Sequence, residues 1–191
     1  LRADDVVLAH PEAYSREFIT INLDELTPYI NGPFTPDAAR SISLMPQTVT
    51  NEDYPEKVDV CLIGSCTNSS YQDMARAASV VKFYREHGYE LKAQLIVCPG
   101  SELVHATAER DGILQIFTEA GATIMTNACG PCIGQWKRIT DDNTRRNSIV
   151  TSFNRNFAKR ADGNPNTHAF ITSPEVAVGY AFTGTLLEHP S

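Results

Sequence analysis

The chain has 191 residues, of which 42% are hydrophobic and 20% are charged, and this is enough material for one sizeable hydrophobic core. Its formal net charge of −7 argues against a protein that binds nucleic acid through its overall field, and no apolar run is long enough to cross a bilayer, so neither partner is expected. The number of cysteines, five, is odd, and no signal-like segment opens the chain, which predicts reduced thiols rather than a secreted disulfide framework. Because it starts at Leu1 rather than at a methionine, we expect a piece of a longer polypeptide.

Residues 1–56 are predicted to form an irregular arm that contacts another domain. Prolines interrupt this segment too often for long elements. Only short pieces fit: residues 18–23 alternate like a half-buried strand, and residues 36–42 could form one or two helical turns after a cap at Thr35. The stretch 27–34 between them is expected to be a turn-rich loop.

Residues 57–191 are predicted to form an α/β domain, because strand-like and helix-like segments alternate along them. The run 58–63 is short, nearly continuous and apolar, as in a buried parallel strand, and a loop of small residues leads from it into a helical pattern over 71–87. Further strands are expected over 95–98, 122–126, 148–151 and 169–172, and further helices over 102–109, 112–120 and 174–182. This rhythm predicts a three-layer α/β/α sandwich with a mostly parallel sheet, in which ligands bind at the carboxyl ends of the strands.

Three cysteines lie in loops that follow predicted strands. Cys66 is in the loop after the first strand, whereas Cys129 and Cys132 form a Cys-Gly-Pro-Cys pair. The pair alone matches a redox dithiol, but a thioredoxin-type site has an aromatic residue before its first cysteine, and here an alanine stands there. Three thiolates can instead meet at a metal centre, either zinc with a fourth ligand or an iron–sulfur cluster with one open iron. Cys61 and Cys98 lie inside predicted strands and are expected to be buried.

A cationic stretch follows the paired cysteines. From Gln135 to Arg160 there are seven basic residues and two acidic ones, which gives a local charge of +5 in a chain of net charge −7. An anionic ligand would favour such a stretch, whereas a solvated loop would leave it inert.

Three motifs together resemble those of the aconitase family, in its mitochondrial type. They are Ile63–Tyr71 (Ile-Gly-Ser-Cys-Thr-Asn-Ser-Ser-Tyr), Asn127–Trp136 (Asn-Ala-Cys-Gly-Pro-Cys-Ile-Gly-Gln-Trp) and Ser152–Phe157 (Ser-Phe-Asn-Arg-Asn-Phe) continued to Arg160. The resemblance extends from about Ile21 to Gly184. Isopropylmalate isomerases share the first and third motifs but usually carry Ser-Met between the paired cysteines, so Gly130-Pro131 favours aconitase. Family members are far longer, and this chain looks like their third, cluster-bearing domain alone.

The resemblance implies a 4Fe-4S cluster held by Cys66, Cys129 and Cys132. It also implies the hydro-lyase reaction of the tricarboxylic acid cycle that interconverts citrate and isocitrate through cis-aconitate. The remaining domains of the same polypeptide are implied partners, and because they carry the catalytic base, the isolated chain is expected to be inactive. A bacterial parent would be cytoplasmic, and a eukaryotic one would lie in the mitochondrial matrix.

Five further residues receive roles from the resemblance. Arg155 and Arg160 would bind substrate carboxylates through the planar guanidinium, whereas Asn154, Asn68 and Ser65 would lie next to the cluster. On a helix the two arginines would point about 140° apart, so a loop is needed if both face one ligand. Three alternatives stay open: an isopropylmalate isomerase-type hydro-lyase, thiol–disulfide exchange at the cysteine pair, and an RNA-binding role supported only by the cationic stretch.

Overall fold

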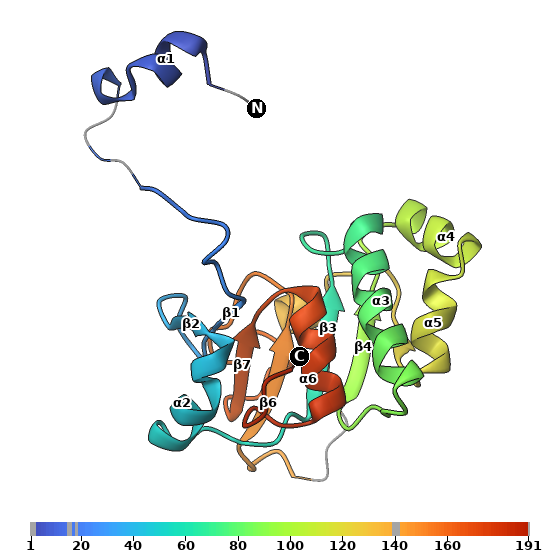
Figure 1. The fold of residues 1–191 in the computed structure, drawn as a ribbon. Coiled ribbons are helices and arrows are strands. Elements are labelled where there is room, and N and C mark those ends of the chain that lie inside the picture. Colours follow the sequence, from blue (N-terminus) through green and yellow to red (C-terminus); the bar gives the residue numbers. More distant parts are fainter. Residues whose placement is uncertain (1–2, 15–16, 18, 139–141, 191) are drawn as a thin grey trace.

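The computed structural model describes residues 3–14, 17, 19–138 and 142–190, and its body is built on a seven-stranded sheet (Figure 1). The strands are β1 (Tyr29–Asn31), β2 (Ala39–Ser41), β3 (Val60–Gly64), β4 (Gln94–Cys98), β5 (Thr123–Ile124), β6 (Asn147–Thr151) and β7 (Thr167–Ile171). Their order is β2-β1-β7-β6-β3-β4-β5. Strands β3 to β7 run parallel, and β1 is antiparallel to both β7 and β2. The predicted α/β class with a mostly parallel sheet is confirmed.

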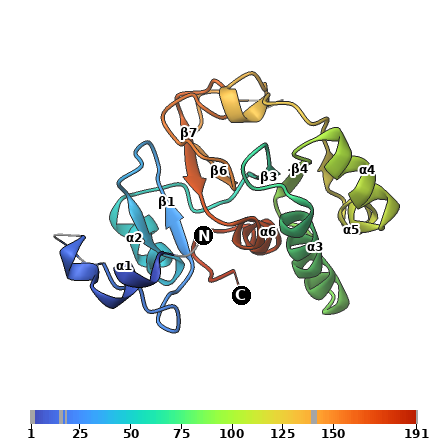
Figure 2. The ribbon, with the colours of Figure 1, turned by 90° about the horizontal axis from the view of Figure 1, so that it is seen from above.

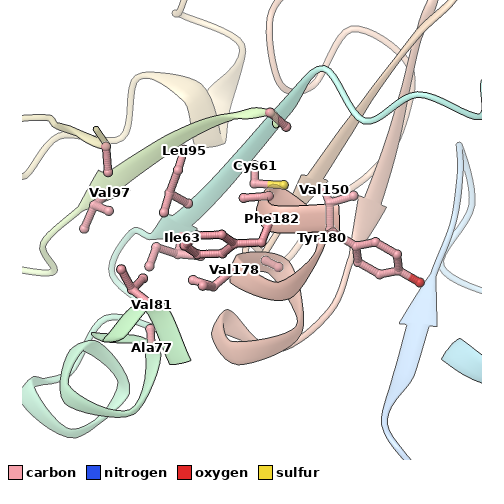
Figure 3. Close-up of a cluster of buried hydrophobic side chains, with 14 of the residues drawn as sticks. Cys61, Ile63, Ala77, Val81, Leu95, Val97, Val150, Val178, Tyr180 and Phe182 are labelled. Carbon is pink, nitrogen blue, oxygen red and sulfur yellow. The ribbon is translucent and has the colours of Figure 1, made fainter. Parts of the chain in front are cut away.

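Helices cover one face of the sheet. They are α3 (Tyr71–Glu86), α6 (Pro174–Thr183), α5 (Ile113–Glu119), α4 (Glu102–Arg110) and the shorter α2 (Met45–Asn51). Cys61 and Ile63 of β3 point towards Phe182 of α6 and Val81 of α3, and they form the main core together with the same-face residues of β4 and β6 (Figure 3). In the part of the chain that the structure describes, no helix is long and apolar enough to span a membrane.

On the opposite face, where the predicted sandwich has a second helical layer, the sheet is covered by loops and one 3₁₀ turn (Figure 2). Because side chains alternate along a strand, Val60 and Leu62 point away from the helices into a second, smaller hydrophobic cluster. That cluster contains Cys132, from the 3₁₀ turn η3 (Pro131–Ile133), and Phe153, from the loop after β6. The covering layer on this face is therefore formed by the segments that carry the predicted site residues.

Helices α3, α4, α5 and α6 begin within one residue of where the sequence predicts them. Ser70 caps α3: its hydroxyl accepts the backbone N–H of Asp73, and the Asp73 carboxylate accepts the backbone N–H of Ser70 in return. At the start of α6, the Ser173 hydroxyl accepts the backbone N–H of Val176, and Pro174 occupies the first helical position. These caps hold the start of each helix next to the end of the strand that precedes it.

The segment 1–56 divides into two parts. Its first part contains the short helices α1 (Asp5–Ala9) and η1 (Pro11–Ala13), neither of which has a buried residue. The strand expected over 18–23 is absent from residues 19–23, where Ile19 is 87% exposed, and Phe18 lies outside the described residues. This part forms an extended arm beside the body (Figure 1).

The second part of that segment belongs to the body instead. Residues 29–31, expected to lie in a loop, form β1, which pairs with β7 at Ile171. Residues 36–42, expected to be helical, contain β2. Local sequence favours turns there, but the pairing with distant β7 stabilises strands. Residues 29–51 thus extend the sheet and contribute Met45 to the main core.

Candidate metal centre

The loop after β3 carries Cys66 and is held tightly against the end of β4. Gly64 has φ of +120°, and a Cβ atom on it would stand 1.9 Å from the carbonyl oxygen of Cys98, so only glycine fits. Ser65 follows with φ of +66° and donates its backbone N–H to the same carbonyl at 3.1 Å. This sharp reversal leaves Cys66 exposed at the carboxyl end of the sheet.

Ser65 itself is buried, and its hydroxyl oxygen has no hydrogen-bond partner among the described residues. Its carbonyl accepts the hydroxyl of Ser69, which closes the loop across its base. Ser65 therefore combines a left-handed backbone conformation with an unpaired buried hydroxyl, next to an exposed thiol. Backbone strain of this kind is common at functional sites.

The loops after β3 and β6 are joined by hydrogen bonds to one residue, Ser152. Its hydroxyl accepts the N–H of Gly64 at 2.9 Å, and its carbonyl accepts the side-chain amide of Asn68 at 2.5 Å. Its own N–H donates to Leu62 at 3.0 Å. Asn68 therefore links the two loops through its side-chain amide.

The paired cysteines differ in exposure. Cys129 is exposed, whereas Cys132 is buried at 8% exposure in η3 and packs in the cluster with Leu62 and Phe153. The Cys132 thiol donates to Oδ1 of Asn154 at 3.7 Å. That contact brings the second and third motifs together, with Asn154 beside a predicted metal ligand.

Gly134 places the cysteine pair against the arginine loop. It has φ of +75°, and a Cβ atom there would stand 3.0 Å from the carbonyl oxygen of Lys159 and 3.2 Å from that of Arg160. Residues 152–160 form an irregular loop, as two arginines facing one ligand would require.

The two arginines are presented differently. Arg155 is exposed, and its Nη1 donates to the carbonyl of Asn154 at 2.9 Å. Arg160 is half-buried with its guanidinium 5.3 Å from the centre of the Phe157 ring, and its Nε has no partner among the described residues. Arg155 and Phe157 also line a cavity of about 290 Å³ with Asn31, Pro36, Asn154, Asn156 and Ile171.

In the described part of the chain, three of the seven basic residues in the cationic stretch form ion pairs with acidic residues outside it. Arg145 Nη2 lies 2.6 Å from Oδ1 of Asp59, and Arg146 Nη1 lies 2.7 Å from Oδ2 of Asp53. Arg138 forms a buried pair with Asp162 at 3.3 Å. These pairs reduce the field that the local charge of +5 suggested, and with it the support for RNA binding.

The remaining two cysteines are buried, as predicted. Burial raises the pKa of the Cys61 thiol, which lies on the helical face of β3. Burial, and secondarily the nearby Cys132, raises the pKa of Cys98 to about 11. Both therefore stay protonated at neutral pH and are poor ligands and nucleophiles.

The three candidate thiols lie on loops at one end of the sheet, but they are not gathered around one point. Within the described residues, no three His, Cys, Asp or Glu side chains are close enough together to hold a metal ion. The donor set nevertheless suits a thiolate-bound centre: Cys66 and Cys129 are exposed to an incoming group, and the Cys132 thiol already has a polar neighbour in Asn154.

Comparison with known proteins gives a consistent result. The family model described as "Aconitase family (aconitate hydratase)" matches residues 3–184. A protein of Gracilaria gracilis named "Aconitate hydratase, mitochondrial" is 53% identical over 100% of this chain, which corresponds to 24% of that protein. Proteins of the same name from Saccharomyces cerevisiae and Candida albicans are 50% and 52% identical over 97% of this chain, again 24% of each. The chain thus spans about a quarter of the length of the curated relatives that it matches.

Proposed function

The chain belongs to the aconitase family, and on that basis we propose that it supplies the cluster-ligand portion of an aconitate hydratase, the hydro-lyase that interconverts citrate and isocitrate through cis-aconitate. One observation carries the proposal. Ser152 joins the loop of Cys66 to the loop of Asn154, and Asn154 contacts Cys132, so all three motifs meet at the carboxyl end of the sheet. That is where α/β proteins bind ligands.

Cys66, Cys129 and Cys132 would hold a 4Fe-4S cluster. When bound, such a cluster supplies an iron without a cysteine ligand, a Lewis acid for the hydroxyl and carboxylate of the substrate. Asn154 would donate or accept a hydrogen bond beside the Cys132 sulfur, and Asn68 would fix the Cys66 loop through Ser152. Ser65, through its left-handed backbone conformation, would orient Cys66 towards the cluster.

Arg155 and Arg160 would bind the carboxylates of the substrate. Arg155 is exposed and uses Nη1 to fix its own loop, which leaves the other guanidinium donors for a ligand. Arg160 is oriented by the ring of Phe157, and its Nε lacks a partner among the described residues. A tricarboxylate offers the number of acceptors that two such groups need.

The partners we propose are citrate, isocitrate, cis-aconitate and the other three quarters of the polypeptide seen in the relatives. The relatives' names place them in mitochondria, so we propose the mitochondrial matrix for a eukaryotic parent and the cytoplasm for a bacterial one. The paired arginines argue against nucleic acid as a partner.

The proposal is tested by anaerobic reconstitution with iron and sulfide, followed by visible and EPR spectra. C66S, C129S and C132S should each lose the iron–sulfur signal, whereas Cys61→Ala, on the opposite face of β3, should keep it. An unchanged spectrum for C66S would remove Cys66 from the ligand set. The isolated chain should not turn over citrate, and measurable turnover would contradict the need for the other portions of the relatives.

Thiol–disulfide exchange is the second candidate, because one cysteine of the pair is exposed and the other buried. An exposed attacking thiol with a protected partner is how redox dithiols are arranged. An insulin-reduction assay separates the two functions. Reduction that persists in C66S but not in C129S would favour exchange over a cluster.

A further inference from the structure

Ser152 is a fully buried polar residue at the point where β6 ends. All three of its hydrogen bonds go to β3 or to the loop that follows it: to the carbonyl of Leu62, from the N–H of Gly64 and from the side-chain amide of Asn68. Sheet pairing between β3 and β6 ends at Leu62 and Thr151, so these bonds continue the contact beyond the regular ladder.

These hydrogen bonds join the loop that carries Cys66 to the loop that carries Asn154. Gly64 lies two residues before Cys66, and Ser152 lies two residues before Asn154, so the hydroxyl bond fixes the separation of the two loops at their base. A second hydrogen bond, from the Asn68 side chain to the Ser152 carbonyl, joins the same two loops after Cys66 in the chain. With one hydrogen bond on each side of it, the Cys66 thiol is restricted in its position relative to Asn154.

We propose that Ser152 is a positioning residue, which sets the place of Cys66 relative to Asn154 and the arginine loop. The inference rests on the proposed function, since the position of Cys66 matters only if it shares a ligand with the Cys132 side of the site. It assigns Ser152 no contact with substrate or cluster.

Few side chains can replace serine at position 152. Alanine would leave the buried N–H of Gly64 without its acceptor, and a threonine methyl would have to enter a fully buried site. Gly64 cannot turn away to find another acceptor, because it is already packed against the Cys98 carbonyl.

The chain offers a matched control in Ser148. It is also fully buried, lies near the start of β6, and donates its hydroxyl to the carbonyl of Lys57 at 2.6 Å, at the opposite end of the strand from the site. S152A and S148A therefore remove the same hydroxyl group at opposite ends of β6, and a comparable loss of thermal stability is expected for both.

Two readouts then separate positioning from simple destabilisation. In the chain without metal, amide hydrogen exchange by NMR should become several-fold faster over residues 64–68 in S152A and not in S148A. After anaerobic reconstitution, S152A should lose its cluster in air several-fold faster than S148A, with an altered EPR spectrum. Equal behaviour of the two variants in both readouts would overturn the proposal.

Asn68→Ala provides a second variant, because Asn68 is half-exposed and its loss should not prevent folding even if S152A does. It should also speed exchange over residues 64–68, and unchanged exchange there would count against the proposal. If the unmodified chain takes up no cluster, the proposed function fails, and the exchange data still decide whether Ser152 holds the Cys66 loop.

Discussion

Gly134 and Arg160 meet backbone to backbone: a Cβ atom on Gly134 would stand 3.2 Å from the carbonyl oxygen of Arg160. Gly134 follows the cysteine pair by two residues, and Arg160 is a proposed substrate ligand. The approach therefore couples the position of the pair to that of the arginine, and it depends on the absence of a side chain at Gly134.

Substitution of this glycine should be more costly than its backbone angle alone suggests. Gly134 and Gly163 have φ of +75° and +76°, but only Gly134 has atoms within 4 Å of its missing Cβ atom. G163A should lose about 1 kcal/mol of unfolding free energy for the left-handed conformation. G134A should lose more, because the arginine loop must also shift. Urea denaturation measures both, and equal losses would show that the contact contributes nothing.

The buried pair between Arg138 and Asp162 should dominate the stability of the loop layer. The two side chains are 10% and 2% exposed, and Asp162 also accepts the hydroxyl of Thr167 at 2.8 Å. D162A leaves a buried guanidinium unpaired and should cost about 3–5 kcal/mol of unfolding free energy. Asp53, whose side chain is 90% exposed, pairs with Arg146 at the surface, and D53A should cost less than about 1 kcal/mol. A loss for D162A as small as for D53A would contradict the prediction.

Alkylation should distinguish the candidate ligands from the structural cysteines. In the folded chain without metal at about pH 8, iodoacetamide should modify Cys66 and Cys129 first, since both are exposed. Cys98 and Cys61 should react only on unfolding, because burial raises the pKa of each thiol and blocks access. Peptide mass spectrometry locates the labels. Early modification of Cys61 would show that the helical face of β3 opens readily.

The same burial predicts lower stability in alkali. The pKa of Cys98 is raised from 9.0 to about 11, so between these values the unfolded chain has released a proton that the folded chain retains. A raised folded-state pKa contributes stability that is complete below pH 9.0 and is lost as the pH rises towards about 11. The midpoint of urea denaturation should fall over this range, and less so in C98A. An equal fall in C98A would assign the loss to other groups, such as Tyr180, whose pKa burial also raises.

Prediction from sequence succeeded where the signal is local. The starts of α3 and α6 and the continuous apolar run of β3 each depend on neighbours in the chain, and the sequence predicts each within two residues. The rule that parallel strands present their carboxyl ends together then brought the loops of Cys66 and Asn154 to one edge.

Features that depend on residues far away in the chain could not be predicted from local sequence. β1 is three residues long and becomes a strand through its contacts with β7 and β2, while its own sequence favours a turn. The cationic stretch looked like a free patch because Asp53 and Asp59, its partners, lie far upstream.

Within the candidate site, the sequence singles out residues with chemical character and not the residues that hold their loops together. The cysteines, arginines and Asn154 carry recognisable functional groups. Ser152 and Gly134 do not, since a serine at a strand end and a glycine after a turn are common. Two signals were available: both residues lie inside the motifs quoted above, and each lies two residues from a named site residue, where backbone geometry matters most.

The place of β3 inside the sheet, between β4 and β6, bears on the order in which the protein matures. Its neighbours are β4, formed some thirty residues later, and β6, formed more than eighty residues later. The contacts that hold the Cys66 loop to Ser152 therefore do not exist until β6 has been synthesised and docked. During synthesis Cys66 leaves the ribosome well before Cys129, Cys132 and Ser152, and in that interval its thiol has none of its partners in the candidate site. If the chain holds the proposed cluster, its loading is expected late in folding, and the nascent chain would depend on a reducing environment until then.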